Sequence, residues 1–321
     1  MDPRTIKQAA SDALLDANYN PKKLAMLHTG VVVLFSLVTS LLSYLLEMGV
    51  ANTGGLAGLG LRSALESAQV VLSLAGSILL PFWQIGFIYA AIRYSRREAV
   101  SAGTLLEGFR KFGPVFRLNL LLSLIAIGVI MASMYIATTI FLFSPLSDGL
   151  YAAAESLLEA TQTTAFTEDM LLQILPHMGW LLGLYFVILL LIELPIYYRY
   201  RMSEFALMAG APGARAAMRE SILISRRRRM DMLKFDFSFW WYYALQLLLT
   251  TVAYADVILT ASGVTLPVSA DALYWILLVI YAALSLLFAR QYGAYYQIAY
   301  ARYYDLLKEN TLPPAGAPTE M

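Results

Sequence analysis

The chain has no cysteine and only two histidines among its 321 residues. The absence of cysteine excludes disulfides, thiolate-held iron–sulfur clusters and thiolate catalysis, and it gives no information on the redox compartment. Neither His28 nor His177 has neighbours at a metal-ligand spacing, so we expect no metal site. The sequence also has no Gly-x-Ser-x-Gly elbow and no glycine-rich phosphate loop carrying a Lys. We therefore expect no catalytic residues and no cofactor.

Basic residues are missing from two long stretches of the chain. None of the 23 Lys and Arg residues lies between Leu118 and Tyr198 or between Phe235 and Ala289. All but Arg62 fall into four clusters, at 4–23, 93–117, 199–234 and 290–308. This pattern is typical of a polytopic membrane protein whose cytoplasmic loops carry the positive charge, and it predicts that both termini are cytoplasmic. The net charge of +1 provides no overall field to attract nucleic acid, so we expect no nucleic-acid partner.

Charged residues are scarce overall, and apolar residues are abundant. The chain is 59% hydrophobic and 14% charged, against roughly 45–50% and about 25% in soluble domains. Several segments approach or exceed the roughly 20 apolar residues that cross a hydrocarbon core. We predict an all-α polytopic protein with six transmembrane helices, at about 24–46, 67–94, 118–143, 180–198, 237–261 and from 272 onward. The predicted division is a cytoplasmic N-terminal amphipathic segment (1–23), a transmembrane domain (24–308) and a flexible cytoplasmic tail (309–321).

The connections between the spans also carry predictions. A Gly-rich turn is expected at 51–60, a break or bend in the second span near Pro81, and short helical stretches at 151–160 and 168–175. Interfacial amphipathic helices are expected on the cytoplasmic side, including segments at 104–117 and 215–234. No signal-peptide cleavage site follows the first apolar run, so we expect the first span to act as an uncleaved anchor. The last helical pattern continues to about Lys308, which makes a helix of roughly 55 Å that extends beyond the bilayer.

Glu193 is the most conspicuous single residue, because it lies in an apolar run two residues before Pro195. Intramembrane carboxylates are costly and usually face a partner or a water-filled cavity. One interpretation is an ion- or substrate-binding point. The preferred interpretation is a structural partner of Arg199 or Arg290.

Two other polar residues are candidates for the same site. Gln84 follows Pro81 in a possible helix break, where transporters can bind solutes, although a proline kink in a packed bundle is commoner. Arg290 either extends its guanidinium to the headgroups or pairs with Glu193, and we favour the first.

The consecutive arginines Arg226, Arg227, Arg228 and Arg229 come just before a predicted span. Four guanidinium groups next to anionic lipid contribute about 1 kcal/mol each to membrane attraction. We expect this block to contact anionic phospholipids and also to help set the topology.

A short block around these arginines carries a family resemblance. A Ser and two basic residues precede a Phe-Asp-Phe-Ser-Phe entry to a span, at Ser221, Arg226, Arg229, Phe235, Asp236, Phe237, Ser238 and Phe239. The block resembles the signature of a bacterial family of uncharacterised integral membrane proteins, catalogued as domain of unknown function 975. That family has a Gly where this chain has Arg227, and a Gly and a Trp where it has Trp241 and Tyr242. The resemblance implies a multi-span protein of the bacterial cytoplasmic membrane and carries no known activity.

Three classes of function are compatible with the sequence. The first, which the sequence favours, is a non-catalytic membrane protein acting in membrane assembly, in envelope homeostasis or as the partner of a membrane complex. The second is a transporter or channel for a small solute or lipid, with its site near Glu193 and Gln84. The third is a lipid-modifying enzyme, which the lack of a catalytic constellation disfavours.

Overall fold

The computed structural model describes residues 2–52, 56–145, 147–149, 151–152, 155, 168–255, 259 and 269–311. These residues form helices and turns, with no strand among them, so the predicted all-α class is confirmed. The chain divides into two compact units. Unit 1 comprises Met1–Leu118 and Met202–Met321, and unit 2 comprises Asn119–Arg201.

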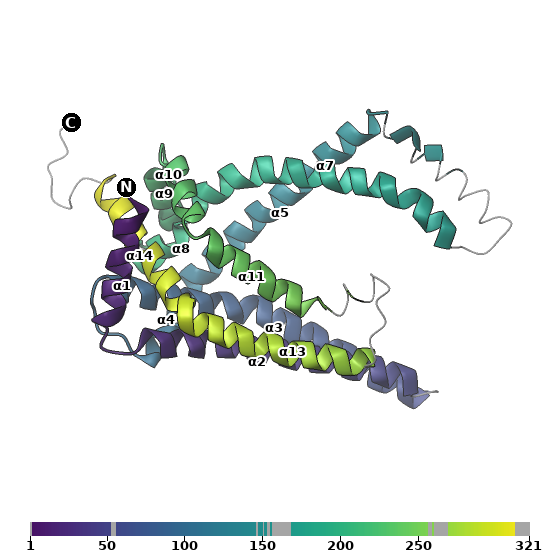
Figure 1. The fold of residues 1–321 in the computed structure, drawn as a ribbon, viewed down its shortest axis with the longest axis horizontal. Coiled ribbons are helices and arrows are strands. Elements are labelled where there is room, and N and C mark those ends of the chain that lie inside the picture. The colour runs from purple at the N-terminus through teal and green to yellow at the C-terminus, as the bar shows by residue number, and fades with distance from the viewer. Residues whose placement is uncertain are drawn as a thin grey trace. The chain divides into compact units, whose positions relative to one another are not determined.

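Most of the helices belong to unit 1 (Figure 1). In chain order they are α1 (Pro3–Leu15), α2 (Pro21–Asn52), α3 (Leu56–Ser95), η1 (Ala102–Leu106), α4 (Glu107–Arg110), α8 (Ser203–Met208), α9 (Ala214–Ser225), α10 (Arg229–Phe237), α11 (Trp240–Ala253), α13 (Ala270–Phe288), η2 (Ala289–Gly293) and α14 (Ala294–Glu309). Helix α5 (Phe112–Leu142) begins in unit 1 and continues into unit 2, which also contains α7 (Glu168–Tyr200).

Within the described residues, five helical segments are long and apolar enough to cross a membrane, with mean hydropathy between 1.8 and 2.4. They are Pro21–Leu46, Arg62–Ser95, Phe112–Leu142, Met178–Met208 and Ala272–Glu309. The protein is therefore a multi-pass membrane protein in its helix composition. The predicted span at 237–261 corresponds to α11, which has 14 residues. Part of that predicted span lies outside the described residues, so the sixth span stays a prediction.

Two local predictions need correction. Helix α3 passes through Pro81 without a break, because the turns that follow Pro81 are buried and their packing outweighs one lost backbone hydrogen bond; a bend there stays a prediction. The Gly-rich turn is shorter than predicted, since α2 extends to Asn52 and α3 begins at Leu56. The predicted helical stretch at 168–175 is confirmed and forms the first part of α7. Most of the predicted tail and of the 151–160 stretch lies outside the described residues.

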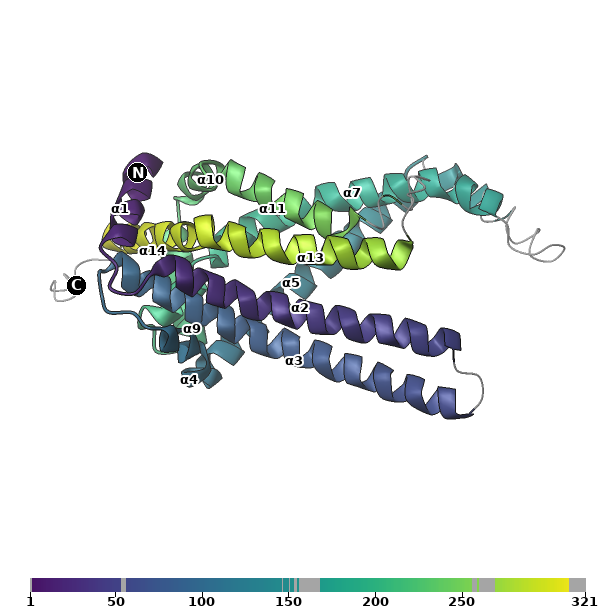
Figure 2. The ribbon, with the colours of Figure 1, turned by 60° about the horizontal axis from the view of Figure 1, so that its bottom comes forward.

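The first helix, α1, is the predicted amphipathic segment. Asp2 caps it by accepting a hydrogen bond from the Arg4 amide at 2.9 Å. Ile6, Ala10 and Ala13 recur at helical spacing and are buried, so one face of α1 packs against α14 and α3. Figures 1 and 2 show α1 running across one end of the long helices of unit 1. We call this end, which also holds η1, α4, α9, α10 and α14, the basic end.

The last helical pattern is continuous, as predicted. Helix α13, the π-helical turn η2 and α14 follow one another without a gap from Ala270 to Glu309. Because α1 packs on α14, the first and last described helices meet at the basic end (Figure 2).

Candidate functional site

A pocket of about 340 Å³ lies among the spans of unit 1. Its walls come from α2, α3, α11, α13, η2 and α14, so segments from both ends of the chain form it. Gln84 of α3, a candidate from the sequence, lines this pocket. The wall also contains hydroxyl, amide and imidazole groups, which are uncommon in apolar helices.

The polar lining residues fall on single faces of their helices. On α11, Tyr242, Gln246 and Thr250 recur every four residues, and on α13 Tyr281 and Ser285 do the same. Residues four apart on a helix lie one above the other. Each helix therefore presents a polar stripe to the pocket. Gln246 and Thr250 are exposed, as are the intervening Leu247 and Leu248 of α11.

His28 of α2 has the most constrained position in the wall. Its imidazole stacks almost parallel to the Phe87 ring, with centroids 4.5 Å apart, and also faces the Trp83 ring at 6.2 Å. Trp83 Nε1 donates a hydrogen bond to the His28 carbonyl at 3.0 Å, and Gln84 lies close enough to interact with the imidazole. The side chain is buried, yet its Nε2 has no hydrogen-bond partner among the described residues. Nε2 itself is covered by protein atoms, so a water or a solute in the pocket lies against the imidazole and reaches this nitrogen only if the wall shifts.

The wall also contains the π-helical turn η2. Ala289 and Gly293, its first and last residues, both line the pocket. Such turns are rare and occur frequently at functional sites, because the extra residue per turn shifts the backbone groups around it. The turn thus singles out the same place as the polar stripes.

The other two sequence candidates do not line this pocket. Arg290 is exposed on η2, and Glu193 is exposed on α7 in unit 2. Within the described part of unit 2, Glu193 forms no ion pair, with Arg199 or otherwise. Its predicted pairing with Arg290 stays a prediction, and so does extension of Arg290 to the headgroups.

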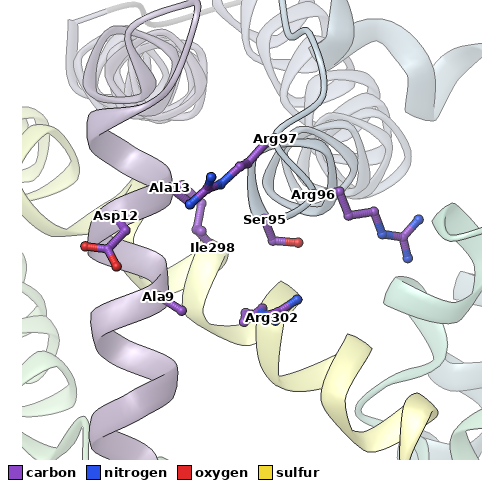
Figure 3. A pocket seen from close by; sticks show the side chains of 8 residues that line it. All are labelled: Ala9, Asp12, Ala13, Ser95, Arg96, Arg97, Ile298 and Arg302. Atoms are coloured by element: carbon purple, nitrogen blue, oxygen red, sulfur yellow. The ribbon is translucent and has the colours of Figure 1, made fainter.

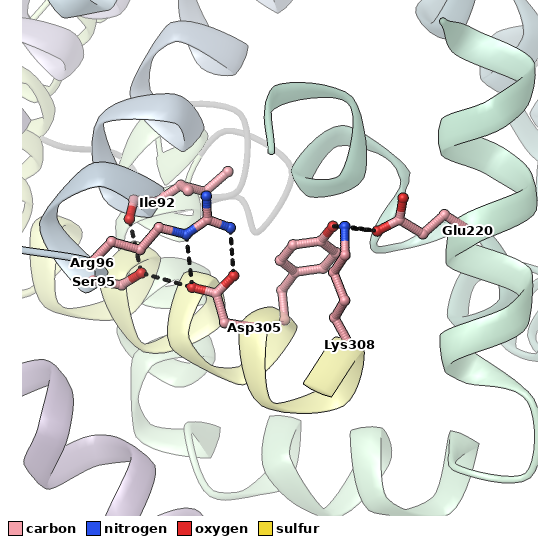
Figure 4. A network of polar contacts seen from close by, with 7 residues as sticks. Ile92, Ser95, Arg96, Glu220, Asp305 and Lys308 are labelled. Atoms are coloured by element: carbon pink, nitrogen blue, oxygen red, sulfur yellow. Dashed lines mark hydrogen bonds and ion pairs between the residues drawn. The ribbon is translucent and has the colours of Figure 1, made fainter. Parts of the chain in front are cut away.

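At the basic end, ion pairs join α14 to the turn after α3 and to α9 (Figure 4). Arg96, the first residue after α3, binds Asp305 of α14 through two hydrogen bonds, from Nη2 at 2.7 Å and from Nε at 3.2 Å. The bond to the Asp305 carboxylate raises the pKa of Arg96 above its usual value. Glu220 of α9 accepts a hydrogen bond from the Tyr304 hydroxyl at 2.5 Å and pairs with Lys308 Nζ at 2.7 Å. These contacts hold the helix ends together next to the pocket-forming segments.

A second pocket, of about 360 Å³, lies between α1, the end of α3 and α14 (Figure 3). Arg96, Arg97, Arg302 and Asp12 are among its lining residues. Arg97 Nη2 lies 3.3 Å from Asp16 Oδ2, in a pair that is mostly exposed. The basic end therefore has arginines outside the predicted Arg226–Arg229 block that are accessible to anionic groups.

The four consecutive arginines form the turn between α9 and α10. Arg226, Arg227 and Arg229 are exposed, and Arg228 is half-buried. Arg227 has a φ of 66°, in the left-handed region that favours glycine. Exposure makes the block available to a charged surface, as its predicted role requires.

The Phe-Asp-Phe-Ser-Phe block lies against α14 and α1. The Tyr300 hydroxyl donates a hydrogen bond to the buried Asp236 carboxylate, and the Phe235 and Phe239 rings pack on Tyr300. Lys7 of α1 donates a hydrogen bond to the Ser238 carbonyl and lies 4.1 Å above the Phe239 ring, where burial lowers the pKa of Lys7. Through these contacts the block links α1 and α14 to the start of α11.

Comparison of the chain with protein-family models, with curated proteins and with solved structures finds no match. The resemblance to the domain-of-unknown-function family therefore rests on the block described above and stays a prediction.

Sequence reasoning missed most of the pocket wall. His28 was considered only as a metal ligand, and Gln246, Gln297 and Tyr281 were not singled out. A signal for them exists, since polar residues recur every four positions on α11 in an otherwise apolar run. Which stripes face one another depends on the packing of helices that are distant in sequence.

Proposed function

We propose that this protein binds a small polar solute in the pocket lined by His28 and Gln84, as a transporter or channel does. The polar wall in a bundle of apolar helices is the observation that carries the proposal. Polar groups inside a bilayer are costly unless they are satisfied by protein, water or solute. Pockets between the helices of a bundle are common ligand sites.

The sequence favoured a non-catalytic membrane protein over a transporter or channel, and this proposal reverses that ranking. A protein of membrane assembly or envelope homeostasis needs no internal polar pocket, whereas a solute carrier does. The proposed site also moves from Glu193 to Gln84 and His28, because Glu193 is exposed and belongs to the other unit.

The proposed topology is six spans in a bacterial cytoplasmic membrane, with both termini in the cytoplasm. The proposed sixth span is the predicted one at 237–261, of which α11 is the main described part. The meeting of α1 and α14 at the basic end supports an even number of crossings. The positive charge of that end supports its placement on the cytoplasmic side.

Membership of the domain-of-unknown-function family is part of the proposal. The left-handed backbone at Arg227 supports it, since the family has a Gly at that position and glycine adopts this conformation without strain.

Contact with anionic phospholipids is a further part of the proposal, supported by the exposed arginines of the α9–α10 turn and by Arg97.

The test uses single cysteines, which the native chain lacks. Ser285→Cys places a thiol in the pocket wall, and Ser77→Cys places one on the exposed apolar half of α3. With the protein in lipid nanodiscs, an uncharged, strongly hydrophilic thiol reagent should label Ser285→Cys and spare Ser77→Cys. Ser11→Cys, exposed on α1, controls for reagent activity. If Ser285→Cys is as unreactive as Ser77→Cys, the pocket is not open to water and the proposed function is wrong.

A further inference from the structure

The charge of the pocket wall restricts what the pocket can hold. Among the described residues, no Asp, Glu, Lys or Arg side chain lines it. A charged solute in such a site would lose its hydration without gaining a counter-charge, which is strongly unfavourable. Arg290 of η2 is next in the chain to the lining residue Ala289, but its side chain is exposed and does not line the pocket. The wall thus selects against both anions and cations.

The hydrogen-bonding groups of the wall are balanced between donors and acceptors. Gln84, Gln246 and Gln297 each carry an amide oxygen and an amide nitrogen, and Thr29 and Ser285 add hydroxyl groups. A hydrocarbon chain would leave these groups without partners. A solute with both donors and acceptors satisfies them.

His28 provides a fixed contact point. Its ring is held by stacking on Phe87 and faces the Trp83 ring. The side chain is 8% exposed, and Nε2 is covered by protein atoms and without a partner in the described part of the chain. A ring fixed by its neighbours in this way gives the pocket a preorganised wall.

The size of the pocket sets the scale of the ligand. Its volume of about 340 Å³ is at the lower end of the roughly 300–1,000 Å³ seen for small-molecule sites. It corresponds to the liquid volume of about ten waters. A peptide or an entire lipid headgroup with its chains does not fit.

From these four observations we infer that the pocket takes a small, neutral solute with an amide-like pairing of hydrogen-bond donor and acceptor, which lies against the His28 imidazole. This inference rests on the proposed function, because it assumes that the pocket is open to solutes. It goes further by naming the chemical class, and it excludes organic anions and cations of the same shape.

The test compares matched probes that differ mainly in charge. Benzamide, benzoate and benzamidine form one set, and acetamide, acetate and acetamidine form a smaller one. Each is added to Ser285→Cys in nanodiscs, and the rate of thiol labelling is measured. We expect a neutral amide to slow labelling, and its charged analogues to bind at least about 100-fold more weakly because their charge is unpaired in the pocket. Equal protection of Ser11→Cys, which is labelled outside the pocket, would mean a non-specific effect and would overturn the inference.

A second variant tests the contact with the His28 imidazole. His28→Phe retains ring stacking and removes both ring nitrogens, so protection by the amide should weaken by between about 2-fold and 10-fold. Gln246→Leu is the parallel variant if His28→Phe does not fold, and labelling of Ser285→Cys without any probe reports on the fold of both. If Ser285→Cys is labelled but no amide protects it, or a charged analogue protects as well, the solute class is wrong while the open pocket stands. If Ser285→Cys is never labelled, the proposed function fails and this inference with it.

Discussion

The two halves of α3 are both apolar, but only one of them is buried. Before Pro81, Val70, Val71 and Leu74 are 58–66% exposed. After it, Phe82, Ile85 and Ile92 are at most 1% exposed, because η1, α4, α14 and α1 cover that half. The half at the basic end is thus packed as a protein core, whereas the other half exposes side chains that suit a hydrocarbon environment. The comparison teaches that apolar composition in a membrane protein does not say which solvent surrounds a segment.

The tightest packing at the basic end depends on two glycines. A Cβ on Gly86 would lie 1.9 Å from the Leu105 carbonyl oxygen, and one on Gly108 would lie 2.0 Å from the Phe82 carbonyl oxygen. Both neighbours are backbone atoms that cannot turn aside. Gly86→Ala and Gly108→Ala should each lower the free energy of unfolding by about 3 kcal/mol or more, because the backbones must separate. Chemical denaturation in mild detergent measures the loss.

Gly60 is the matched control on the other half of the same helix. Nothing lies within 4 Å of a Cβ added there, and its φ is not in the left-handed region. Gly60→Ala should be neutral or slightly stabilising, since alanine is the better helix former. A similar loss of stability in Gly60→Ala and Gly86→Ala would break the comparison between the two halves.

Each half of α3 also has an ion pair in it or directly after it, and the second prediction compares them. Arg96 binds the nearly buried Asp305, whose side chain is 10% exposed, while Arg62 binds Glu66 in a pair whose side chains are about half exposed. Arg96→Gln should cost about 2 kcal/mol, because it leaves a buried carboxylate unpaired. Arg62→Gln should cost less than about 1 kcal/mol.

A double-mutant cycle with Asp305→Asn separates the pair from other effects of the substitutions. Coupling between Arg96 and Asp305 should exceed that between Arg62 and Glu66, and it should persist at high salt. Equal coupling energies would mean that burial at the basic end does not strengthen its ionic contacts.

Periodicity is a local property of the sequence, and two of the helices that it predicts are confirmed. The amphipathic α1 follows from Ile6, Ala10 and Ala13, and the continuous α13–α14 follows from an uninterrupted apolar and aromatic pattern. A break at Pro81, one of the two predicted alternatives, does not occur, and the sequence does not reveal the partners that bury the following turns. The pocket was missed for a related reason, since His28 and Gln246 meet only through the packing of α2 and α11.

Gln84 and Glu193 repeat the comparison at the scale of single residues. Both are polar groups in apolar helices, and the carboxylate attracts attention because its burial would cost more. The structure places the amide in a pocket wall and leaves the carboxylate exposed. The cost of burying a group indicates how unusual a buried position would be, but it does not show that the group is buried.

The smallest expected effect is that of Glu193→Gln. The sequence predicts a loss of stability, because a structural partner of Arg199 or Arg290 would leave a cation unpaired when neutralised. The exposure of Glu193 and the lack of an ion pair to it within the described part of unit 2 predict the opposite. The free energy of unfolding, measured by thermal unfolding in two detergents, should change by no more than about 0.5 kcal/mol, as for other exposed substitutions.

A loss above about 1 kcal/mol in both detergents would instead support the pairing, with Arg290 as the remaining partner. Arg290→Gln in the Glu193→Gln background would then cost little more, since the pair would already be broken.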